Sequence, residues 1–563
     1  MGEKARTFLR EYRLVPYYLR RLTELTDSYR ADNADTAAIL KSFEQEWDQI
    51  EPLRQWISQH RETDSALHAW CSRYADEGWE LLELRRSSDE AISWLKPAIE
   101  SARILMWRDA EARHLMRLGI ALMNKGEHGA AIPEIENGLV VARACGDEFS
   151  QLQCLHLLGK AHRNAGDQYE AAETYYRQAL ELVRRLDSPC MESRILTDLG
   201  NARANQGLYH EALDYYEQAE DISQANNCRE ARDRAARQGY IGNARRNLGE
   251  YAAAIAAYRT AIELDSEAGD PQNTGLHTFN LALVYGELGQ FQQQKEEMEK
   301  ALDLARRIAD ERGISKALNG LGGALAYLQR YDEAVDCHLT SLNLLQRMNA
   351  RLLEGYVRAD LGVTHLLYGH FDEALEHLQA ALQIARDRDH TLQQQERHFL
   401  IGQAYLLQGH LERALDHFQQ ARRFDSEKNT NTTRHKSAAL HGIALARLGQ
   451  PARAQETFRE ALGFLPDLQD FSTMYVQGLI LAGLALLTSG DARADYLRQA
   501  QAAYRQALER CSAACIVADA LRMLATLQGL DPENALQPVR ACLQESQQTA
   551  PTPGFPRCAN PDG

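Results

Sequence analysis

The chain has 563 residues, of which 44% are hydrophobic and 25% are charged, so it is too long for one ordinary domain and too apolar to be disordered throughout. Its formal net charge of −16 argues against duplex nucleic acid as the main ligand, because such a protein repels the phosphate backbone. A cationic or mixed-charge protein partner fits this charge better.

The N-terminal residues 1–15 are charged from residue 3 onward and lack the apolar core of a secretory signal. The longest apolar run, residues 479–487, is about half the roughly 20 residues that a membrane-spanning helix needs. The ten cysteines are scattered singly and form no CxxC pair, which predicts reduced, buried thiols. The sequence therefore predicts a soluble, cytoplasmic protein with no membrane contact.

Residues 1–105 have a helical pattern of apolar residues that does not match the repeat found later in the chain. We predict an N-terminal helical module over this range. The sequence contains no GxxxxGK[ST] motif, so it offers no phosphate cradle of that kind.

A pattern of about 40 residues recurs from residue 106 to residue 510. Most units have an anchoring small residue followed by Gly, Ala, an aromatic residue and Ala at offsets 7, 12, 16 and 19. The weak units replace some of these residues, as Gln294, His338 and Ser341 do. The anchors are Gly119, Gly159, Gly200, Gly242, Ala282, Gly322, Gly362, Gly402, Gly442 and Gly483. A mid-helix glycine costs about 1 kcal/mol relative to alanine, so we expect each anchor to nest against the alanines of a second helix. The second glycine, such as Gly207, falls where the first helix must end.

This pattern resembles the tetratricopeptide repeat (TPR) family, although the unit has about 40 residues instead of 34 and lacks the family's early Trp and closing Pro. The resemblance implies an all-α solenoid, a right-handed superhelix of nine to ten helix-turn-helix pairs over residues 106–510, with the first helices on the concave wall. The long units, together with residues 17–57 and 78–105, look similar to the TPR sensor arm of bacterial STAND/NB-ARC signalling proteins without its NTPase. We predict capping helices at residues 511–545 and a disordered tail at residues 546–563.

First-helix residues at offsets −6, −3, +1, +4 and +5 from the anchor share one helix face. In repeats two to four this face, here called the polar stripe, is basic and amidic and contains no acid. Its residues are His156, Lys160, Arg163, Asn164, Arg194, Asn201, Asn205, Asn243, Arg246 and Asn247. Arginine and asparagine can bind a carboxylate or a peptide backbone, and the resemblance implies that role in peptide-binding TPR proteins. We predict a partner-binding site for a protein or peptide with acidic or carboxylate groups. The alternative is that these side chains cap neighbouring carbonyls or are merely solvated.

The same face is apolar in later repeats, and its residues are Val363, Leu366, Leu367, Phe399, Leu406 and Leu407. This apolar wall fits a partner helix docked by its hydrophobic face, or core burial inside a tightly wound superhelix. The repeated histidines, His370, His377, His410 and His417, are interpreted as packing residues, because a seven-residue step supplies too few ligands for a metal. We predict no metal and no cofactor.

No Ser/His/Asp, Cys/His or paired-carboxylate arrangement stands out, so the sequence predicts no catalytic residue. The first functional hypothesis is a non-enzymatic adaptor or sensor that binds a protein or peptide in the concave groove. The alternative is a regulatory subunit that restrains or activates a separately encoded effector enzyme, a protease or an NTPase, in bacterial signalling or defence. A third hypothesis, hydrolysis by the N-terminal helices, resembles TPR-linked response-regulator phosphatases.

Overall fold

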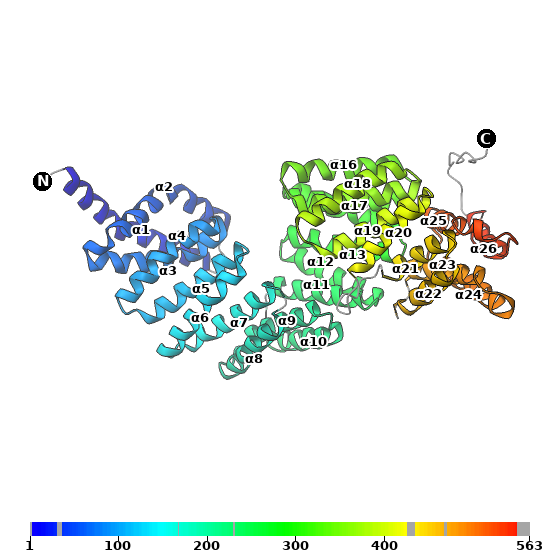
Figure 1. The fold of residues 1–563 in the computed structure, drawn as a ribbon. Helices are drawn as coiled ribbons and strands as arrows, with labels where there is room; N and C mark the ends of the chain where they lie inside the picture. The colour runs from blue at the N-terminus through cyan, green and yellow to red at the C-terminus, as the bar shows by residue number, and fades with distance from the viewer. Residues whose placement is uncertain are drawn as a thin grey trace. The chain divides into compact units, whose positions relative to one another are not determined.

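The computed structural model describes residues 3–30, 36–166, 168–228, 231–424, 434–466 and 470–548, and every regular element in these ranges is a helix (Figure 1). This result confirms the predicted all-α class. The chain divides into two compact units, residues 1–229 (unit 1) and residues 230–563 (unit 2). The predicted tail lies outside the described residues except for residues 546–548, which end the last helix.

Unit 1 begins with four helices and continues with three helix pairs. The bounds are α1 Glu3–Arg30, α2 Thr36–His60, η1 Arg61–Thr63, α3 Ser65–Arg85, α4 Ser88–Ile104, α5 Arg108–Asn124, α6 His128–Cys145, α7 Glu148–Asn164, α8 Tyr169–Arg185, α9 Pro189–Asn205 and α10 Tyr209–Ala225. Each helix from α3 onward packs against the next one along the chain. The first helices of successive pairs, α3, α5, α7 and α9, also contact one another and form a continuous first-helix wall.

Unit 2 contains seven further pairs, from α11 to α24, and two closing helices. The bounds are α11 Ala231–Asn247, α12 Tyr251–Glu267, α13 Pro271–Glu287, α14 Phe291–Arg307, α15 Glu311–Tyr327, α16 Tyr331–Arg347, α17 Arg351–Tyr368, α18 Phe371–Asp387, α19 Thr391–Leu407, α20 Leu411–Arg423, α21 Arg434–Arg447, α22 Pro451–Gly463, α23 Phe471–Leu486, α24 Gly490–Arg510, α25 Ala514–Ala525, η2 Gln528–Leu530 and α26 Gln537–Gln548. Among all described helices, none has the length and apolar composition that crossing a membrane requires.

The contact that sets the spacing within a pair joins the anchor glycine to a residue 16 or 17 positions later. A Cβ added to Gly159 would lie 2.5 Å from the Tyr176 ring, and one added to Gly200 would lie 2.5 Å from the Tyr216 ring. The alanine contact that we predicted comes second, at 3.1 Å from the Ala212 carbonyl oxygen. The ring therefore rests directly on the glycine, because any larger residue would push the two helices apart.

This packing begins before residue 106. Gly78 of α3 and Trp94 of α4 have the same separation of 16 residues, and a Cβ on Gly78 would lie 2.9 Å from the Trp94 ring. The repeat was not visible there in the sequence, because α3 has no second glycine at its end. Packing of the repeat type therefore extends into the segment assigned to the N-terminal module.

The second glycine ends the first helix, as the sequence predicts. Gly207 has φ of +80° and Gly369 has φ of +81°, the left-handed conformation that glycine adopts without a Cβ clash. Gln329 occupies the same position in its own repeat and has φ of +64°. The turn geometry is therefore kept even where the glycine is absent.

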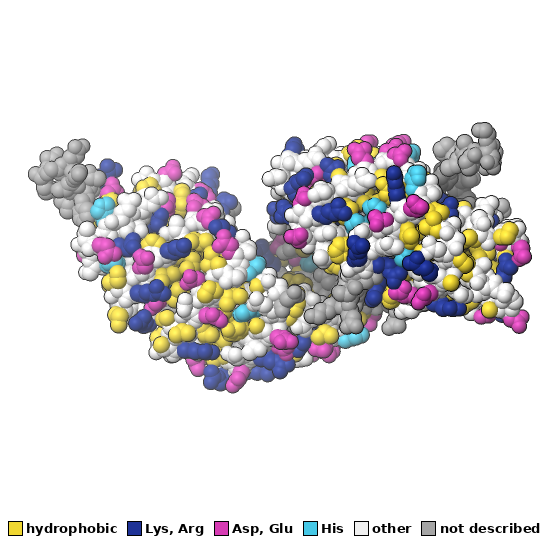
Figure 2. All heavy atoms as spheres, viewed as in Figure 1, with side chains coloured by type: hydrophobic (Ala, Val, Ile, Leu, Met, Phe, Trp, Pro, Cys, Tyr) yellow, Lys and Arg dark blue, Asp and Glu magenta, His cyan; other side chains and the backbone are white. Residues whose placement is uncertain are grey.

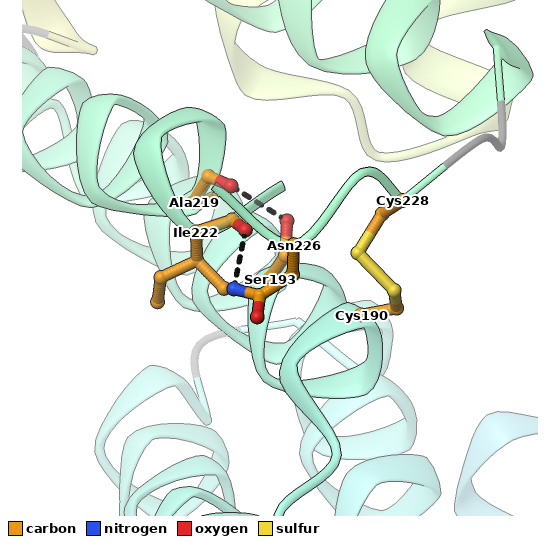
Figure 3. Close-up of a disulfide and its surroundings, with 6 residues drawn as sticks. All are labelled: Cys190, Ser193, Ala219, Ile222, Asn226 and Cys228. Atoms are coloured by element: carbon orange, nitrogen blue, oxygen red, sulfur yellow. Dashed lines mark hydrogen bonds between the residues drawn. A yellow bond between two sulfur atoms is a disulfide. The ribbon is translucent and has the colours of Figure 1, made fainter. Parts of the chain in front are cut away.

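The structure contradicts the prediction of reduced thiols for one pair of cysteines, whereas seven other described cysteines are free: Cys71, Cys145, Cys154, Cys337, Cys511, Cys515 and Cys542. Cys190, at the start of α9, forms a disulfide with Cys228, which follows α10 (Figure 3). Beside it, the Ser193 hydroxyl donates to the Ala219 carbonyl over 2.7 Å and joins the same two helices. The cysteines are 38 residues apart, close to one repeat, and stacking of the pair brings them together.

Candidate binding surfaces

The polar stripe is divided between the two units. Seven of its ten residues lie in unit 1, and Asn243, Arg246 and Asn247 lie in unit 2. The exposed members are Asn164, Arg194, Asn205 and Asn247. The others are buried or partly buried, so their contacts inside the protein must be accounted for before any binding role.

An aspartate beside the stripe pairs with two of its members. His156 Nε2 lies 2.8 Å from Asp198 Oδ2, and Arg163 Nη1 lies 2.7 Å from Asp198 Oδ1. Burial raises the pKa of Asp198, but the hydrogen bond from His156 and the charges of His156 and Arg163 outweigh burial and hold this pKa well below its usual range. Although the stripe itself contains no acid, these two side chains therefore already have an anionic partner.

Two asparagines of the stripe accept hydrogen bonds from the tyrosines of their own repeats. The Tyr216 hydroxyl donates to Asn201 Oδ1 over 2.7 Å, and the Tyr258 hydroxyl donates to Asn243 Oδ1 over 2.6 Å. Both rings are buried, and a buried hydroxyl without a partner costs about 1–3 kcal/mol. The Tyr176 hydroxyl, whose repeat has a lysine in place of the asparagine, has no hydrogen-bond partner among the described residues. The asparagines therefore complete the core of their repeats.

Arg246 and Asn247 also have partners inside unit 2. Arg246 Nη2 lies 2.5 Å from Glu287 Oε1, and Glu287 occupies offset +5 of the next repeat, so the stripe acquires an acid there. Burial lowers the pKa of Arg246, but the hydrogen bond and charge of Glu287 raise it overall. Asn247 donates from Nδ2 to the Asn243 carbonyl over 2.8 Å.

The first-helix wall of unit 1 contains a hollow of about 410 Å³. Figure 2 shows hydrophobic side chains gathered over α3, α5 and α7, which line it together with α9. Phe149 is 63% exposed at its edge. Arg113 and Arg117 also line the hollow and both pair with Asp76, at 2.8 and 2.5 Å. His156 is the polar-stripe residue that reaches this hollow.

The predicted apolar wall of unit 2 is covered by helix α25 of the same chain. The apolar face of α25 is buried in one core with α17, α19, α21 and α23, and its residues are Val517, Ala520, Met523 and Leu524. Arg522 donates to the carbonyls of Leu366 and Leu367, at the end of α17, over 2.9 and 3.1 Å. The Leu366 carbonyl also accepts from the backbone N–H of Gly369 over 3.1 Å, so Arg522 adds a second donor at this helix end. The structure therefore supports core burial for this wall, and the buried helix belongs to the chain itself.

An open groove of about 500 Å³ remains on the first-helix wall of unit 2, over α13, α15 and α17. Leu276 and Tyr356 are 46% and 40% exposed on its sides. Gly323 lies on α15, where an added Cβ would meet no atom within 4 Å, so the groove is hollow above this helix. Asn319 Nδ2 donates to Asp360 Oδ2 over 2.5 Å and provides a polar point among the apolar walls.

Comparison with known families identifies the repeat. Sequence models of the tetratricopeptide repeat match residues 156–238, 241–267, 279–307 and 313–387. These parts of the chain are tetratricopeptide repeats. No curated protein matches this TPR chain in sequence.

Solved structures similar to this TPR protein include the apo form of RapI, with 17% sequence identity and a TM-score of 0.46, covering 64% of this chain and 98% of that one. A Rap protein complexed with competence and sporulation factor has 13% identity and a TM-score of 0.45, covering 65% of this chain and 99% of that one. A STAND protein with a TPR sensor from Pyrococcus horikoshii has 13% identity and a TM-score of 0.46, covering 62% of this chain and 52% of that one.

The repeated histidines of the TPR array lie at two kinds of position. His370 and His410 precede α18 and α20 as N-cap residues. His377 stacks on His365 with ring centroids 5.5 Å apart, and His417 Nδ1 lies 3.2 Å from His398 Nδ1. Burial lowers the pKa of His377 and that of His417, so these rings pack as neutral side chains between the two helices of a repeat.

Proposed function

We propose that this TPR protein is a non-enzymatic adaptor or sensor that binds a protein or peptide on its first-helix wall. The observation that supports this most directly is the open groove over α13, α15 and α17. Its walls expose Leu276 and Tyr356, and an extended peptide can cover these side chains with its own apolar residues. Asn280 lines the same groove, and an amide side chain can both donate to and accept from a peptide backbone, whereas Asn319 already bonds Asp360 and His338.

The exposed members of the polar stripe in unit 1 form a second contact region within this proposal. They are Asn164, Arg194 and Asn205, on the first helices of that unit, whereas Asn247 lies on α11 of unit 2 and is not part of this region. Arginine binds carboxylates through a forked pair of hydrogen bonds, so Arg194 suits an acidic group of a partner. The buried members of the stripe hold the repeats together, and we assign the contact with a partner to the exposed ones.

The experiment captures proteins from the native cell lysate on three immobilised versions of the chain. The groove variant is Leu276→Glu, and the matched control is Leu339→Glu, a leucine of the second helix α16 that is 39% exposed. We expect wild type and the control to retain the same partner and the groove variant to lose it, with equal melting temperatures. If the Leu276→Glu variant retained the partner and an Arg194→Glu variant lost it, the binding site would lie at the polar stripe and not in the groove.

The regulatory-subunit hypothesis is supported by a different surface. Ile104, Met106 and Trp107, at the turn between α4 and α5, are 56%, 67% and 37% exposed. Three neighbouring apolar side chains at one exposed turn suit a protein contact. If the protein holds an effector enzyme through unit 1, Met106→Ser with Trp107→Ser should release that enzyme, whereas Leu276→Glu should not. The opposite result would favour the adaptor.

A further inference from the structure

A cavity of about 260 Å³ lies between α25 and the first-helix wall of unit 2. Most of its lining is aliphatic or aromatic, contributed by α15, α17, α19, α21, α23, α24 and α25. It shares Tyr327, Val363 and Leu367 with the open groove. Four of its lining side chains are polar or charged in addition to the tyrosines: Gln403, Lys436, Ser472 and Asp519.

Lys436 of α21 is the only cation among the residues that line this cavity, and it makes no ion pair or hydrogen bond with any of the described residues. Burial lowers the pKa of its ammonium group, and the charges of Asp470 and Glu396 partly offset this decrease. The Lys436 side chain is partly exposed, so its ammonium group can remain charged without a partner from the chain. A cation without a partner at the wall of a mostly apolar cavity attracts an anion.

The acids around Lys436 are already used by other groups. Asp470 accepts from the backbone N–H of Thr473 over 2.6 Å as the N-cap of α23. The Glu396 carboxylate lies 2.5 Å from Arg397 Nη1. Asp519, across the cavity on α25, lies 3.6 Å from Arg522 Nη1. None of these acids pairs with Lys436, so its positive charge is available to an external anion that enters the cavity.

A second polar group on the cavity wall also lacks a partner. The Tyr504 side chain of α24 is fully buried, and its hydroxyl has no hydrogen-bond partner among the described residues. Tyr504 rests on Gly478, 26 residues earlier, and not on the predicted anchor Gly483, where an added Cβ would lie 2.5 Å from the Phe458 ring of the preceding pair. The residue after Gly478 is Leu479, where two other repeats have asparagine after the glycine. This cavity therefore combines apolar walls with one unpaired cation and one unpaired hydroxyl.

We propose that this cavity binds an apolar carboxylate, with the carboxylate at Lys436 and the apolar part between α25 and the first-helix wall. If each water occupies about 30 Å³ of liquid, the cavity volume is that of eight or nine waters, so an acid of roughly six to eight carbons fits. The same chemistry is present in a free organic acid and in the C-terminal residue of a peptide. The proposal does not depend on peptide binding in the open groove.

Isothermal titration of the full-length protein with octanoate tests this assignment. Wild type should bind octanoate, Lys436→Met should weaken binding at least tenfold, and octanol should not bind. The matched control is Lys300→Met, which changes an exposed lysine of the second helix α14 and should leave octanoate affinity unchanged. The proposal would be overturned if wild type bound neither octanoate nor the peptide. It would also be overturned if Lys436→Met bound octanoate as tightly as wild type.

A peptide arm distinguishes the two sources of the carboxylate. Acetyl-Gly-Gly-Leu-Leu with a free C-terminus is compared with its C-terminal amide. If the free-acid peptide binds more tightly than octanoate and this binding is lost in Lys436→Met, the ligand is a peptide C-terminus. If octanoate binds and the peptide does not, the ligand is a small organic acid. Equal binding of acid and amide contradicts a role for Lys436. Loss in Leu276→Glu but not in Lys436→Met would instead locate the peptide in the open groove.

A measurement on the unaltered protein covers the case in which Lys436→Met does not fold. Reductive methylation followed by mass spectrometry reports how far each lysine reacts. Octanoate should reduce the methylation of Lys436 at least threefold. Lys316, an exposed lysine of α15, should be methylated equally with and without octanoate. Equal reaction of Lys436 in the presence and absence of saturating octanoate would overturn the assignment.

Discussion

The hydrogen bond between Tyr258 and Asn243 predicts a specific pattern of stabilities in a double-mutant cycle. Tyr258→Phe removes a 2.6 Å hydrogen bond but leaves the partly exposed Asn243 amide able to bind water, so it should cost about 1 kcal/mol. Asn243→Ala removes the acceptor of the buried Tyr258 hydroxyl and leaves Arg246 as the side chain that can still bond it, so this substitution should cost about 1–3 kcal/mol. The double variant removes both groups and should cost less than the sum, by about 1 kcal/mol.

Urea denaturation followed by circular dichroism measures these differences as shifts in midpoint at constant slope. The matched control is Tyr176→Phe, because the Tyr176 hydroxyl lacks a hydrogen-bond partner among the described residues. Its removal should be neutral or stabilising. Two results would refute the reasoning: additive effects of Tyr258→Phe and Asn243→Ala, or a loss in Tyr176→Phe as large as that in Tyr258→Phe.

Three further predictions concern packing, protonation and the disulfide. Gly322→Ala places a Cβ 2.8 Å from the His338 ring and should destabilise the protein by about 1–3 kcal/mol. Gly323→Ala places a Cβ where no atom lies within 4 Å and should stabilise the protein by up to about 1 kcal/mol. If urea denaturation showed stability changes of the same sign for both variants, this packing would be contradicted. Burial lowers the pKa of His338 to about 4, below its ordinary value near 6.5, so the unfolded chain binds the proton first. Stability present at pH 7 should fall from about pH 6.5 towards pH 4, and a melting temperature constant over that range would argue against it. Reduction of the Cys190–Cys228 disulfide should lower the free energy of unfolding by up to about 4 kcal/mol for a 38-residue separation, and Cys190→Ser should then be insensitive to reductant in thermal melts.

Local signals in the sequence were sufficient to predict the helix pairs. The turn at Gly207 and the anchor at Gly200 depend on backbone conformation and on contacts within one repeat, which recur along the chain and can be seen as a period. The residue that contacts the anchor could be predicted less well. Both Ala212 and Tyr216 recur at fixed offsets, and only the crossing of the helices shows that the ring lies closer to the glycine.

The candidate site could be predicted less well, because its contacts join different repeats. Asp198 lies one repeat away from His156 and Arg163 and just outside the offsets used to define the polar stripe. Nothing in the spacing of single cysteines pairs Cys190 with Cys228. The position of α25 is the extreme case, since Arg522 bonds to a helix end more than 150 residues earlier in the chain.

The docking of α25 also has a consequence for synthesis of the chain on the ribosome. The Cys515 thiol donates to the Tyr327 carbonyl across a separation of 188 residues, so the first helix of the wall, α15, is synthesised long before the helix that covers the wall. At about 5–20 residues per second, that interval lasts roughly 10–40 seconds. During this time Leu366, Phe399 and their neighbours face water in a nascent chain. We therefore expect the newly made protein to associate with chaperones until α25 emerges and closes the second unit.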